Sequence, residues 1–452
     1  MNLHIVILAA GQGSRMKSDL PKVLHKVAGK SMLQHVIDTV SHLEADGIHI
    51  VIGHGSEQVK SNIVGNVNWC YQAEQLGTGH AVAQALPSIP ANSQVLVLYG
   101  DVPLISADTL SAMLHTTNET NLALLTVELE NPQGYGRIIR NFEGSIKAIV
   151  EEKDASEEEK DITEVNTGIL ALTSNQLHKY IPQLGNNNAQ GEYYLTDLIA
   201  LANKSGDKIK AHHPQFEQEV QGVNNRLQLC ELECWYQSRL AEELMLEGVT
   251  LYDPHRIDVR GSLKCGKDVE IDINCIFIGD VELGSNVKVG PNCIIENSSI
   301  GSNTTILANS LVQDSEVQDF VSIGPFARLR PGTKLENNTK VGNFVETKKT
   351  ILGEGSKINH LSYVGDALIG KNVNIGAGTI TCNYDGVNKS NTEIEDGVFV
   401  GSNTSLVAPV KIKSNSTIGA GSTVTKTVEK EQLAIARSKQ KNIDGWQRPI
   451  KK

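Results

Sequence analysis

The chain has 452 residues, 40% hydrophobic and 21% charged, which is enough for two or three domains with separate cores. Its net charge of −11 argues against non-specific binding to nucleic acid or to an anionic membrane surface. Its seven cysteines form no C-x-x-C pair, its N-terminus does not read as a signal peptide, and it contains no apolar run of membrane length. We therefore expect a cytoplasmic protein with reduced thiols.

The first predicted element is a strand over residues 5–10, a continuous apolar run typical of burial on both faces. A glycine loop over residues 11–18 follows, and the backbone N–H groups of such loops can bind phosphate. Two familiar phosphate-binding patterns fail, because each requires glycine at position 16, which is Met16. The glycines alone leave phosphate binding and a simple turn equally open, but the cations Arg15 and Lys22 favour a polyphosphate.

A second buried strand is predicted over residues 95–99 and leads into Gly100 and Asp101. An aspartate at the carboxyl end of a strand in an open α/β sheet lies where ligands bind. The alternative is a structural turn, because Asp101-Val102-Pro103 is a good turn sequence.

Apolar residues at helical spacing predict one helix over residues 226–248, with Asn225 as its cap and Gly248 at its end. We expect this helix to link a domain of residues 1–225 to a domain of residues 249–452.

Between residues 263 and 424 an aliphatic residue followed by glycine recurs at multiples of about six positions, as in Val289-Gly290 and Ile418-Gly419. This period fits neither a helix nor an alternating strand, but it fits a parallel β-solenoid in which every sixth side chain points to the axis. Because no single turn can bury its own apolar residue, the turns must stack. A series of ordinary hairpins is the less favoured alternative.

Three features of the solenoid indicate more than a scaffold. Arg330 and Lys348 are 18 residues apart, about one turn, so both can hold one phosphate. His360 and Tyr363 follow on the next turn; a lone histidine is more often a surface residue, but beside an anion site it favours a base. The repeat is interrupted over residues 381–400, and insertions in solenoids usually leave on a binding face.

The segment Leu8–Lys22 closely resembles the signature of sugar-1-phosphate nucleotidyltransferases, with Ser14 at a position for threonine or serine. The resemblance implies an α/β, Rossmann-like fold that transfers uridylyl from UTP, with Arg15 and Lys22 offsetting phosphate charge and Mg²⁺ held by Asp101 and Asn224. It implies contacts of UTP and the sugar nucleotide with Leu8, Ala9, Ala10, Gly11, Lys22, Gln72, Gly77, Thr78, Tyr99, Gly100, Asp101, Gly136, Glu151, Asn166 and Asn224. Two alternatives stay open: Glu151 begins an acidic run that could be a solvated surface, and Asn224 could cap the next helix.

The solenoid resembles the hexapeptide-repeat family, whose coil is a left-handed β-helix. Its polar cluster resembles the acetyltransferase half of the bacterial bifunctional N-acetylglucosamine-1-phosphate uridyltransferases/glucosamine-1-phosphate acetyltransferases, and with the N-terminal half the resemblance covers essentially the whole chain. It implies that His360 is the catalytic base, that glucosamine-1-phosphate contacts Arg330, Lys348, Tyr363 and Asn374, and that acetyl-CoA contacts Ala377, Asn383, Tyr384, Ser402, Ala420 and Arg437. It also implies a homotrimer in which neighbouring chains complete each acetyl site.

We therefore predict a nucleotidyltransferase domain over residues 1–225, a helical linker over 226–248, and a β-helix acetyltransferase domain with a basic tail over 249–452. The expected product is UDP-N-acetylglucosamine, a precursor of cell wall and lipopolysaccharide. Two alternatives remain. In one, the solenoid is a structural or allosteric arm on a nucleotidyltransferase of single activity. In the other, the whole chain is a non-catalytic assembly subunit.

Overall fold

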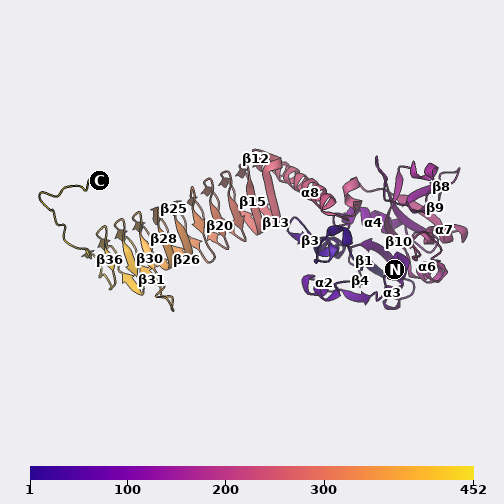
Figure 1. Ribbon diagram of the computed structural model, residues 1–452, viewed down its shortest axis with the longest axis horizontal. Coiled ribbons are helices and arrows are strands. Elements are labelled where there is room, and N and C mark those ends of the chain that lie inside the picture. The colour runs from indigo at the N-terminus through magenta and orange to yellow at the C-terminus, as the bar shows by residue number, and fades with distance from the viewer. Residues whose placement is uncertain (452) are drawn as a thin grey trace. The chain divides into compact units, whose positions relative to one another are not determined.

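The computed structural model describes residues 1–451 and divides the chain into two compact units, Met1–Tyr236 and the residues from Gln237 onward. Figure 1 labels the elements of both units. The boundary falls inside the long helix α8 (Arg226–Leu246).

Unit 1 is built on a nine-stranded mixed sheet. The strands of its main path are, in spatial order, β11 (Lys208–His212), β7 (Asn121–Glu128), β10 (Glu164–Thr173), β6 (Gln94–Tyr99), β1 (Leu3–Ala9), β4 (Gly47–Ile52) and β5 (Asn68–Tyr71). Only β10 runs antiparallel to its neighbours β6 and β7 on this path, whereas the hairpin of β8 (Arg137–Arg140) and β9 (Ile146–Val150) extends the sheet beside β10. The two predicted strands are confirmed: β1 and β6 are parallel neighbours in the middle of the sheet.

Helices cover both faces of this sheet because its strands are apolar on both sides. Val6 and Leu8 of β1 belong to the buried cluster that contains residues of α3, α6 and α7, whereas Ile5 and Ile7 belong to the cluster that contains residues of α1 and α4. The helices are α1 (Met32–Ser41), α2 (Ser56–Asn62), α3 (Thr78–Ala85), α4 (Ala107–Thr116), α5 (Glu157–Lys160), α6 (Ser174–Tyr180) and α7 (Asp197–Lys204). Shorter elements are the 3-10 turns η1 (Ser14–Met16), η2 (Lys22–Leu24), η3 (Leu86–Ser88), η4 (Ile181–Gln183) and η5 (Glu217–Val220) and the strands β2 (Lys26–Val27) and β3 (Lys30–Ser31).

Helix α8 begins where the sequence predicts a helix and ends two residues earlier than predicted. Its start is capped by Asn225, whose Oδ1 accepts a hydrogen bond from Gln228 N at 2.9 Å. The capping function is therefore filled by the neighbour of Asn224, and the Asn224 side chain is directed elsewhere.

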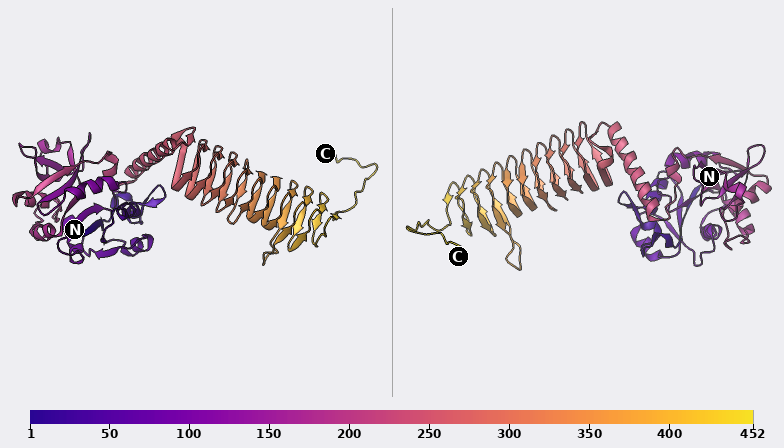
Figure 2. Two further views of the ribbon diagram at one scale, coloured as in Figure 1. Left: turned by 180° about the vertical axis from the view of Figure 1, so that it is seen from behind. Right: turned by 45° about the horizontal axis from the view of Figure 1, so that its top comes forward.

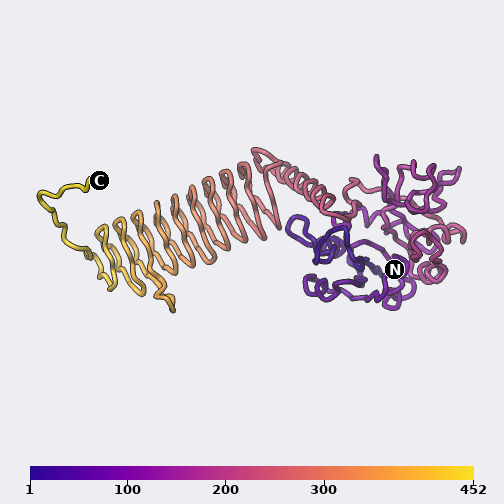
Figure 3. Tube along the Cα trace, in the orientation of Figure 1, coloured from indigo at the N-terminus to yellow at the C-terminus, as the bar shows by residue number. Residues whose placement is uncertain are grey.

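After the end of α8, the chain forms a parallel β-helix of stacked coils from Thr250 to Ala434, visible as separate rungs in the trace of Figure 3. One face is an 11-stranded sheet of β12 (Thr250–Leu251), β14 (Glu270–Ile271), β16 (Lys288–Val289), β19 (Thr305–Ile306), β22 (Ser322–Ile323), β25 (Lys340–Asn343), β27 (Lys357–His360), β29 (Asn374–Ile375), β32 (Phe399–Val400), β35 (Thr417–Ile418) and β37 (Leu433–Ala434). We call it face A. The 3-10 turn η6 (Pro254–Arg256) lies between β12 and β13 in the first coil.

The other two faces form one 15-stranded sheet, because long strands such as β26 and β28 continue around the corner between them. Its strands are β13 (Ile257–Cys265), β15 (Cys275–Leu283), β17 (Ile294–Glu296), β18 (Ser299–Ile300), β20 (Leu311–Gln313), β21 (Glu316–Val317), β23 (Arg328–Leu329), β24 (Lys334–Leu335), β26 (Glu346–Leu352), β28 (Tyr363–Ile369), β30 (Ile380–Cys382), β31 (Thr392–Ile394), β33 (Ser405–Val407), β34 (Val410–Ile412) and β36 (Thr423–Val424). The part that follows face A in each coil, which includes β23, β30 and β33, is called face B.

The predicted six-residue repeat is confirmed. The aliphatic residue of each repeat is buried, for example Ile323, Ile358 and Ile418, all 0% exposed. Register partners on adjacent coils are 17 or 18 residues apart, as in Glu346↔Tyr363 and Arg328↔Glu346. At Ala367↔Thr392 the separation rises to 25, because the loop between β30 and β31 leaves the stack, as Figure 2 shows.

The corner between faces A and B is made by one residue per coil in the left-handed conformation. In nine successive coils these residues are Asn274, Asn292, Asn309, Phe326, Phe344, Leu361, Gly378, Asn403 and Gly421. Asparagine and glycine adopt this conformation readily, whereas phenylalanine and leucine rarely do. The three bulky residues are consecutive, and the corner they form lies beside His360.

Candidate active sites

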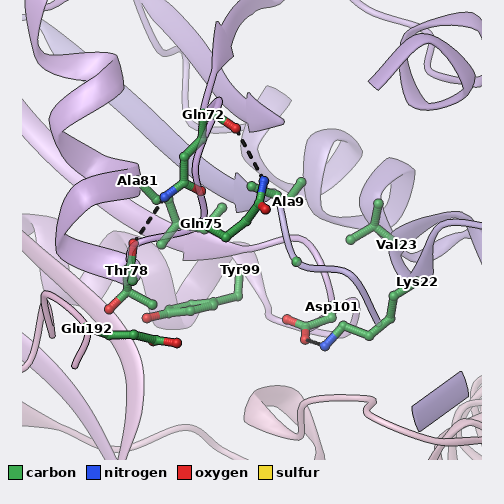
Figure 4. A pocket seen from close by; sticks show the side chains of 14 residues that line it. Ala9, Lys22, Val23, Gln72, Gln75, Thr78, Ala81, Tyr99, Asp101 and Glu192 are labelled. Atoms are coloured by element: carbon green, nitrogen blue, oxygen red, sulfur yellow. Dashed lines mark hydrogen bonds and ion pairs between the residues drawn. The ribbon is translucent and has the colours of Figure 1, made fainter. Parts of the chain in front are cut away.

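The main pocket of unit 1 opens at the carboxyl ends of β1 and β6 and has a volume of about 320 Å³. It is lined by Leu8, Ala9, Ala10, Gly11, Lys22, Val23, Gln72, Gln75, Gly77, Thr78, Ala81, Tyr99, Asp101 and Glu192. In Figure 4, Lys22 and Asp101 lie on one side of the pocket, Gln72 and Thr78 lie on the other, and the Tyr99 ring lies between them. Parallel strands bring their carboxyl ends to one edge of the sheet, so the loops after β1 and β6 meet there.

Four predicted residues converge at the Lys22 side of the pocket. The Lys22 ammonium forms an ion pair with Asp101 and donates to Asn224 Oδ1 at 3.2 Å. Arg15 donates to the same Asn224 oxygen at 2.8 Å. Gly13 permits this arrangement, since a Cβ at that position would lie 2.6 Å from Lys22 Cβ. The cations of Arg15 and Lys22 therefore lie together with the oxygens of Asp101 and Asn224, although Asn224 is about 200 residues from the two cations in the sequence.

The two oxygens of this group, from Asp101 and Asn224, are of the kind that binds Mg²⁺. Asp101 Oδ2 and Asn224 Oδ1 both contact one ammonium, so they are close enough to bind one small cation together. Mg²⁺ typically takes one or two protein oxygens and completes its shell with phosphates and water. Among residues 1–451 the structure shows no group of three or more His, Cys, Asp or Glu side chains arranged to hold a metal ion.

At the opposite end of the pocket, Gln72 is fixed by its neighbours. It is 2% exposed, and its Nε2 donates to Gly77 O at 3.2 Å. Gly77 has φ of 111°, and a Cβ there would lie 2.6 Å from Tyr193 O. The glycine at 77 is required both by its backbone conformation and by this close approach.

A third group of predicted residues gathers around Glu151. Asn166 N donates to Gly136 O at 2.8 Å, and a Cβ on Gly136 would lie 3.4 Å from Glu151 Oε2. Asn166 Oδ1 accepts from Gly168 N at 3.0 Å, and Gly168 packs directly against the pocket residue Tyr99. Glu151 is partly buried, and burial raises its pKa, so it does not belong to the solvated acidic surface considered above.

In the β-helix, His360 is the last residue of β27 on face A. Its Nδ1 is 2.6 Å from Oδ1 of Asn343, its register partner one coil earlier. If this amide oxygen accepts, Nδ1 carries the hydrogen and the lone pair is on Nε2. Asn343 was not predicted from the sequence, although a spacing of 17 residues connects the two positions.

The predicted acetyl-CoA residues continue this line from coil to coil along the same corner. Gly378 N donates to His360 O at 3.4 Å, Asn403 N to Ala377 O at 2.7 Å, and Gly421 N to Ser402 O at 2.8 Å. Arg437 then donates to Ala420 O at 2.6 Å. Successive coils are about 4.8 Å apart. The residues therefore form one column with His360 at its end.

Arg330, Lys348 and Tyr363 lie together on face B. Arg330 donates to Glu346 Oε1 at 2.8 Å, and Glu346 is the register partner of Tyr363. Lys348 is paired in register with Gly365, where a Cβ would lie 2.4 Å from the Tyr363 hydroxyl oxygen. The phenol thus lies over Gly365, the register partner of Lys348.

The loop between β30 and β31 adds a third cation that the sequence did not reveal. The pKa of Lys348 is held below its ordinary value chiefly by the positive charge of the neighbouring Lys389, and further by desolvation and by Arg330. Asn383, at the base of the loop, donates from Nδ2 to Asp366, and Tyr384 is exposed on the loop. The loop therefore folds back toward the cations of face B.

Asn374 lies apart from this cluster. Its register partner is Lys357, on face A, three positions before His360. Three residues of strand span about 10 Å. Within one chain, Asn374 is therefore separated along face A from the cations of face B.

Across residues 1–451 the structure contains no helix that combines the length and apolarity needed to cross a membrane.

Comparison with known proteins gives matches to both units. Residues 5–157 match the family described as MobA-like NTP transferase domain, and residues 391–426 match the bacterial transferase hexapeptide (six repeats). "Bifunctional protein GlmU" of Marinobacter nauticus is 62% identical over 450 residues, covering 99% of both chains. The proteins of the same name from Saccharophagus degradans and Legionella pneumophila (strain Lens) are 57% and 56% identical, and each alignment covers 100% of this chain and at least 99% of the relative.

Proposed function

The chain belongs to the family of bifunctional GlmU proteins, and we propose that its β-helix acetylates glucosamine-1-phosphate while its N-terminal unit converts the product into UDP-N-acetylglucosamine. It is thus a nucleotidyltransferase and an acetyltransferase in one polypeptide, with a left-handed β-helix in its C-terminal half.

In the uridylyl step, a phosphate oxygen of N-acetylglucosamine-1-phosphate attacks the α-phosphorus of UTP. A new phosphorus–oxygen bond forms, the bond to the β-phosphate oxygen breaks, and pyrophosphate leaves with the electron pair. The reaction needs positioning and charge neutralisation rather than a protein nucleophile. Lys22 and Arg15 supply positive charge at the side of the pocket where the phosphates would lie.

Asp101 and Asn224 would hold Mg²⁺, which supplies charge neutralisation on the phosphates when it is bound. Gln72, Gly77 and Thr78 form the end of the pocket assigned to uracil. Gly136, Glu151 and Asn166 are assigned to the sugar hydroxyls. The remaining assigned contacts are the backbone of Leu8, Ala9, Ala10 and Gly11 at the end of β1 and Tyr99 and Gly100 at the end of β6.

In the acetyl step, the amine of glucosamine-1-phosphate attacks the thioester carbonyl of acetyl-CoA. His360 Nε2 takes a proton from the amine, the carbon–sulfur bond breaks, and the CoA sulfur leaves with the electron pair and gains a proton. Arg330 and Lys348, with Lys389, bind the phosphate, and Tyr363 lies beside it. Acetyl-CoA runs along the column of Ala377, Ser402 and Ala420 to Arg437, with Asn383 and Tyr384 on the adjoining loop.

We assign the working form as a homotrimer. Asn374 lies on face A, about 10 Å along the strand from the corner, so it would reach the sugar bound on face B of a second copy. The corner between these faces carries Phe326, Phe344 and Leu361, which are 49%, 56% and 62% exposed. A contiguous exposed apolar row marks an interaction surface. The cytoplasm is the compartment we assign, since UTP and acetyl-CoA are available there.

This proposal rests on the presence of one polar cluster in each unit. Lys22 and Asp101 belong to the cluster of unit 1, and His360 and Lys348 belong to that of the β-helix. The test is an assay with glucosamine-1-phosphate, acetyl-CoA, UTP and Mg²⁺ that measures free CoA and pyrophosphate separately. Asp101→Ala should lower pyrophosphate release at least about 100-fold and leave CoA release unchanged. His360→Ala should lower CoA release about 100-fold or more and leave pyrophosphate release from supplied N-acetylglucosamine-1-phosphate unchanged.

Loss of both steps in either variant would contradict two independent sites. No CoA release in the wild type would favour a solenoid that is only a structural or allosteric arm. No Mg²⁺-dependent pyrophosphate release would favour a non-catalytic assembly subunit.

A further inference from the structure

Residues 193–196 connect the unit 1 pocket to the group of residues around Glu151, which is far from it in the sequence. Gly79 N donates to Tyr193 O at 2.8 Å, and Leu195 N donates to Thr78 Oγ1 at 3.0 Å. This segment is thereby bound to the loop at the uracil end of the pocket. Its last residue, Thr196, contacts Glu151.

The Thr196 hydroxyl is directed to Glu151 rather than to its own helix. Thr196 precedes α7, at a position where a threonine oxygen commonly accepts a backbone N–H of the first turn. In the described part of the chain, Thr196 makes no such capping bond, and its Oγ1 donates to Glu151 Oε1 at 2.9 Å. Thr196 is 8% exposed, so water competes little for this hydrogen bond.

The surroundings of Glu151 oppose its ionisation. Burial raises its pKa, the Thr196 hydrogen bond lowers it, and Asp197 and Asp154 raise it again. Tyr99 and Tyr194 also interact electrostatically with Glu151. An ionised carboxylate only accepts hydrogen bonds and so suits sugar hydroxyls as donors. The Thr196 hydroxyl is the contact that favours this form.

We propose that Thr196 is a positioning residue for uridylyl transfer, whose hydroxyl holds the Glu151 carboxylate in the orientation in which it accepts hydrogen bonds from the hydroxyls of the sugar phosphate. This inference rests on the proposed function of unit 1 and adds a residue to the sugar end of its pocket. Because the same segment contacts Thr78, the uracil end of the pocket and Glu151 are joined by one short stretch of chain.

The test is Thr196→Val, which keeps the shape of the side chain and removes the hydroxyl. Pyrophosphate release should show a KM for N-acetylglucosamine-1-phosphate raised about tenfold, the usual effect of losing a hydrogen bond to a charged group. The KM for UTP should stay within about twofold of the wild type, within the spread of an unaffected contact. The acid limb of kcat/KM for the sugar phosphate should move to higher pH, and Thr196→Ser should restore most of both effects.

Thr173→Val serves as the control, because Thr173 Oγ1 caps α6 by accepting from Gln176 N at 3.2 Å and does not line the pocket. It should lower the Tm and leave both KM values and the pH profile unchanged. The inference is overturned if Thr196→Val raises the two KM values equally. It is also overturned if Thr196→Val leaves the acid limb in place while Glu151→Gln abolishes sugar-phosphate binding. If the wild type releases no pyrophosphate from UTP and N-acetylglucosamine-1-phosphate, the proposed function fails, and the inference with it.

Discussion

His49 shows how one buried side chain sets the response of unit 1 to pH. His49 on β4 and His4 on β1 are 1% and 6% exposed, and Nε2 of His49 is 3.0 Å from Nδ1 of His4. Burial, and then the neighbouring His4, lower the pKa of His49 from its ordinary 6.5 to about 4. Two adjacent imidazoles in the middle of a sheet cannot both carry a proton at low cost.

The sign of the effect follows from proton uptake. On acidification the unfolded chain binds a proton at His49 near pH 6.5, whereas the folded chain does so only near pH 4. We therefore predict that the free energy of unfolding falls between these pH values, by up to about 1.4 kcal/mol per pH unit. The measurement is urea unfolding followed by tryptophan fluorescence, to which Trp69 contributes from β5, the neighbour of β4.

The same titration on His49→Asn should have a smaller slope with pH, even if its stability at pH 7 is lower. His42→Asn, at an exposed histidine of the same unit, should keep the wild-type slope. Equal slopes in all three proteins would show that the histidine pair is not responsible.

His360 lies on a coil whose backbone packs closely against the preceding coil. At Gly342 this contact leaves no room for a side chain. A Cβ on Gly342 would lie 2.0 Å from the carbonyl oxygen of Asn359 on the next coil. Such a contact cannot be relieved by rotating a side chain, because both atoms belong to backbones in register. The neighbours of these two residues are Asn343 and His360, which form the hydrogen bond that orients the imidazole.

We predict that Gly342→Ala displaces this rung and lowers the acetyl rate about 100-fold, the usual effect of an error of about 1 Å in positioning. Uridylyl transfer should be unaffected, since it depends on unit 1 alone. Separate measurement of CoA and pyrophosphate release checks both statements. Gly185→Ala is the control, because a Cβ there meets nothing within 4 Å. An acetyl rate near that of the wild type would mean that the rung adjusts without moving His360.

At the scale of the whole molecule, the corner residues Phe326 and Phe344 are exposed to solvent and have an unfavourable backbone conformation, and no contact within residues 1–451 of one chain compensates for this. Their rings stack with centroids 5.3 Å apart, and both residues have positive φ. A bulky residue in this conformation is strained and persists where function requires it. Burial of the exposed rings against a second copy would offset that strain.

If the proposed homotrimer forms through this corner, Phe326→Asn combined with Phe344→Asn should weaken it and lower acetyl transfer at least about tenfold at micromolar protein, because each site would then lose the second chain proposed to complete it. Asparagine occupies the same corner position in other coils, so the coil itself should fold normally. Light scattering gives the mass, and circular dichroism checks the β-helix. A trimer of unchanged stability would place the interface elsewhere. Pyrophosphate release from supplied N-acetylglucosamine-1-phosphate should stay as in the wild type.

The sequence could predict the elements whose signal is local. The buried strands β1 and β6 follow from unbroken apolar runs, and the β-helix follows from its six-residue period, because each signal lies within a few consecutive residues. The start of α8 was predictable from Asn225 for the same reason. The family resemblance identified Asn224 and Glu151 as candidate ligand contacts but gave no protein partners for their side chains, such as Arg15 for Asn224 and Thr196 for Glu151.

Contacts between distant residues were decided only by the tertiary structure. Asn343 orients His360, Lys389 lies against Lys348, and Thr196 hydrogen-bonds Glu151, yet no local pattern marks the first member of each pair. A coil of 17 or 18 residues with an inserted loop does not reveal which side chains meet until its register is fixed. A local pattern determines whether a segment forms a strand or a helix and which of its faces is buried. The partners of a side chain depend instead on how separate segments pack.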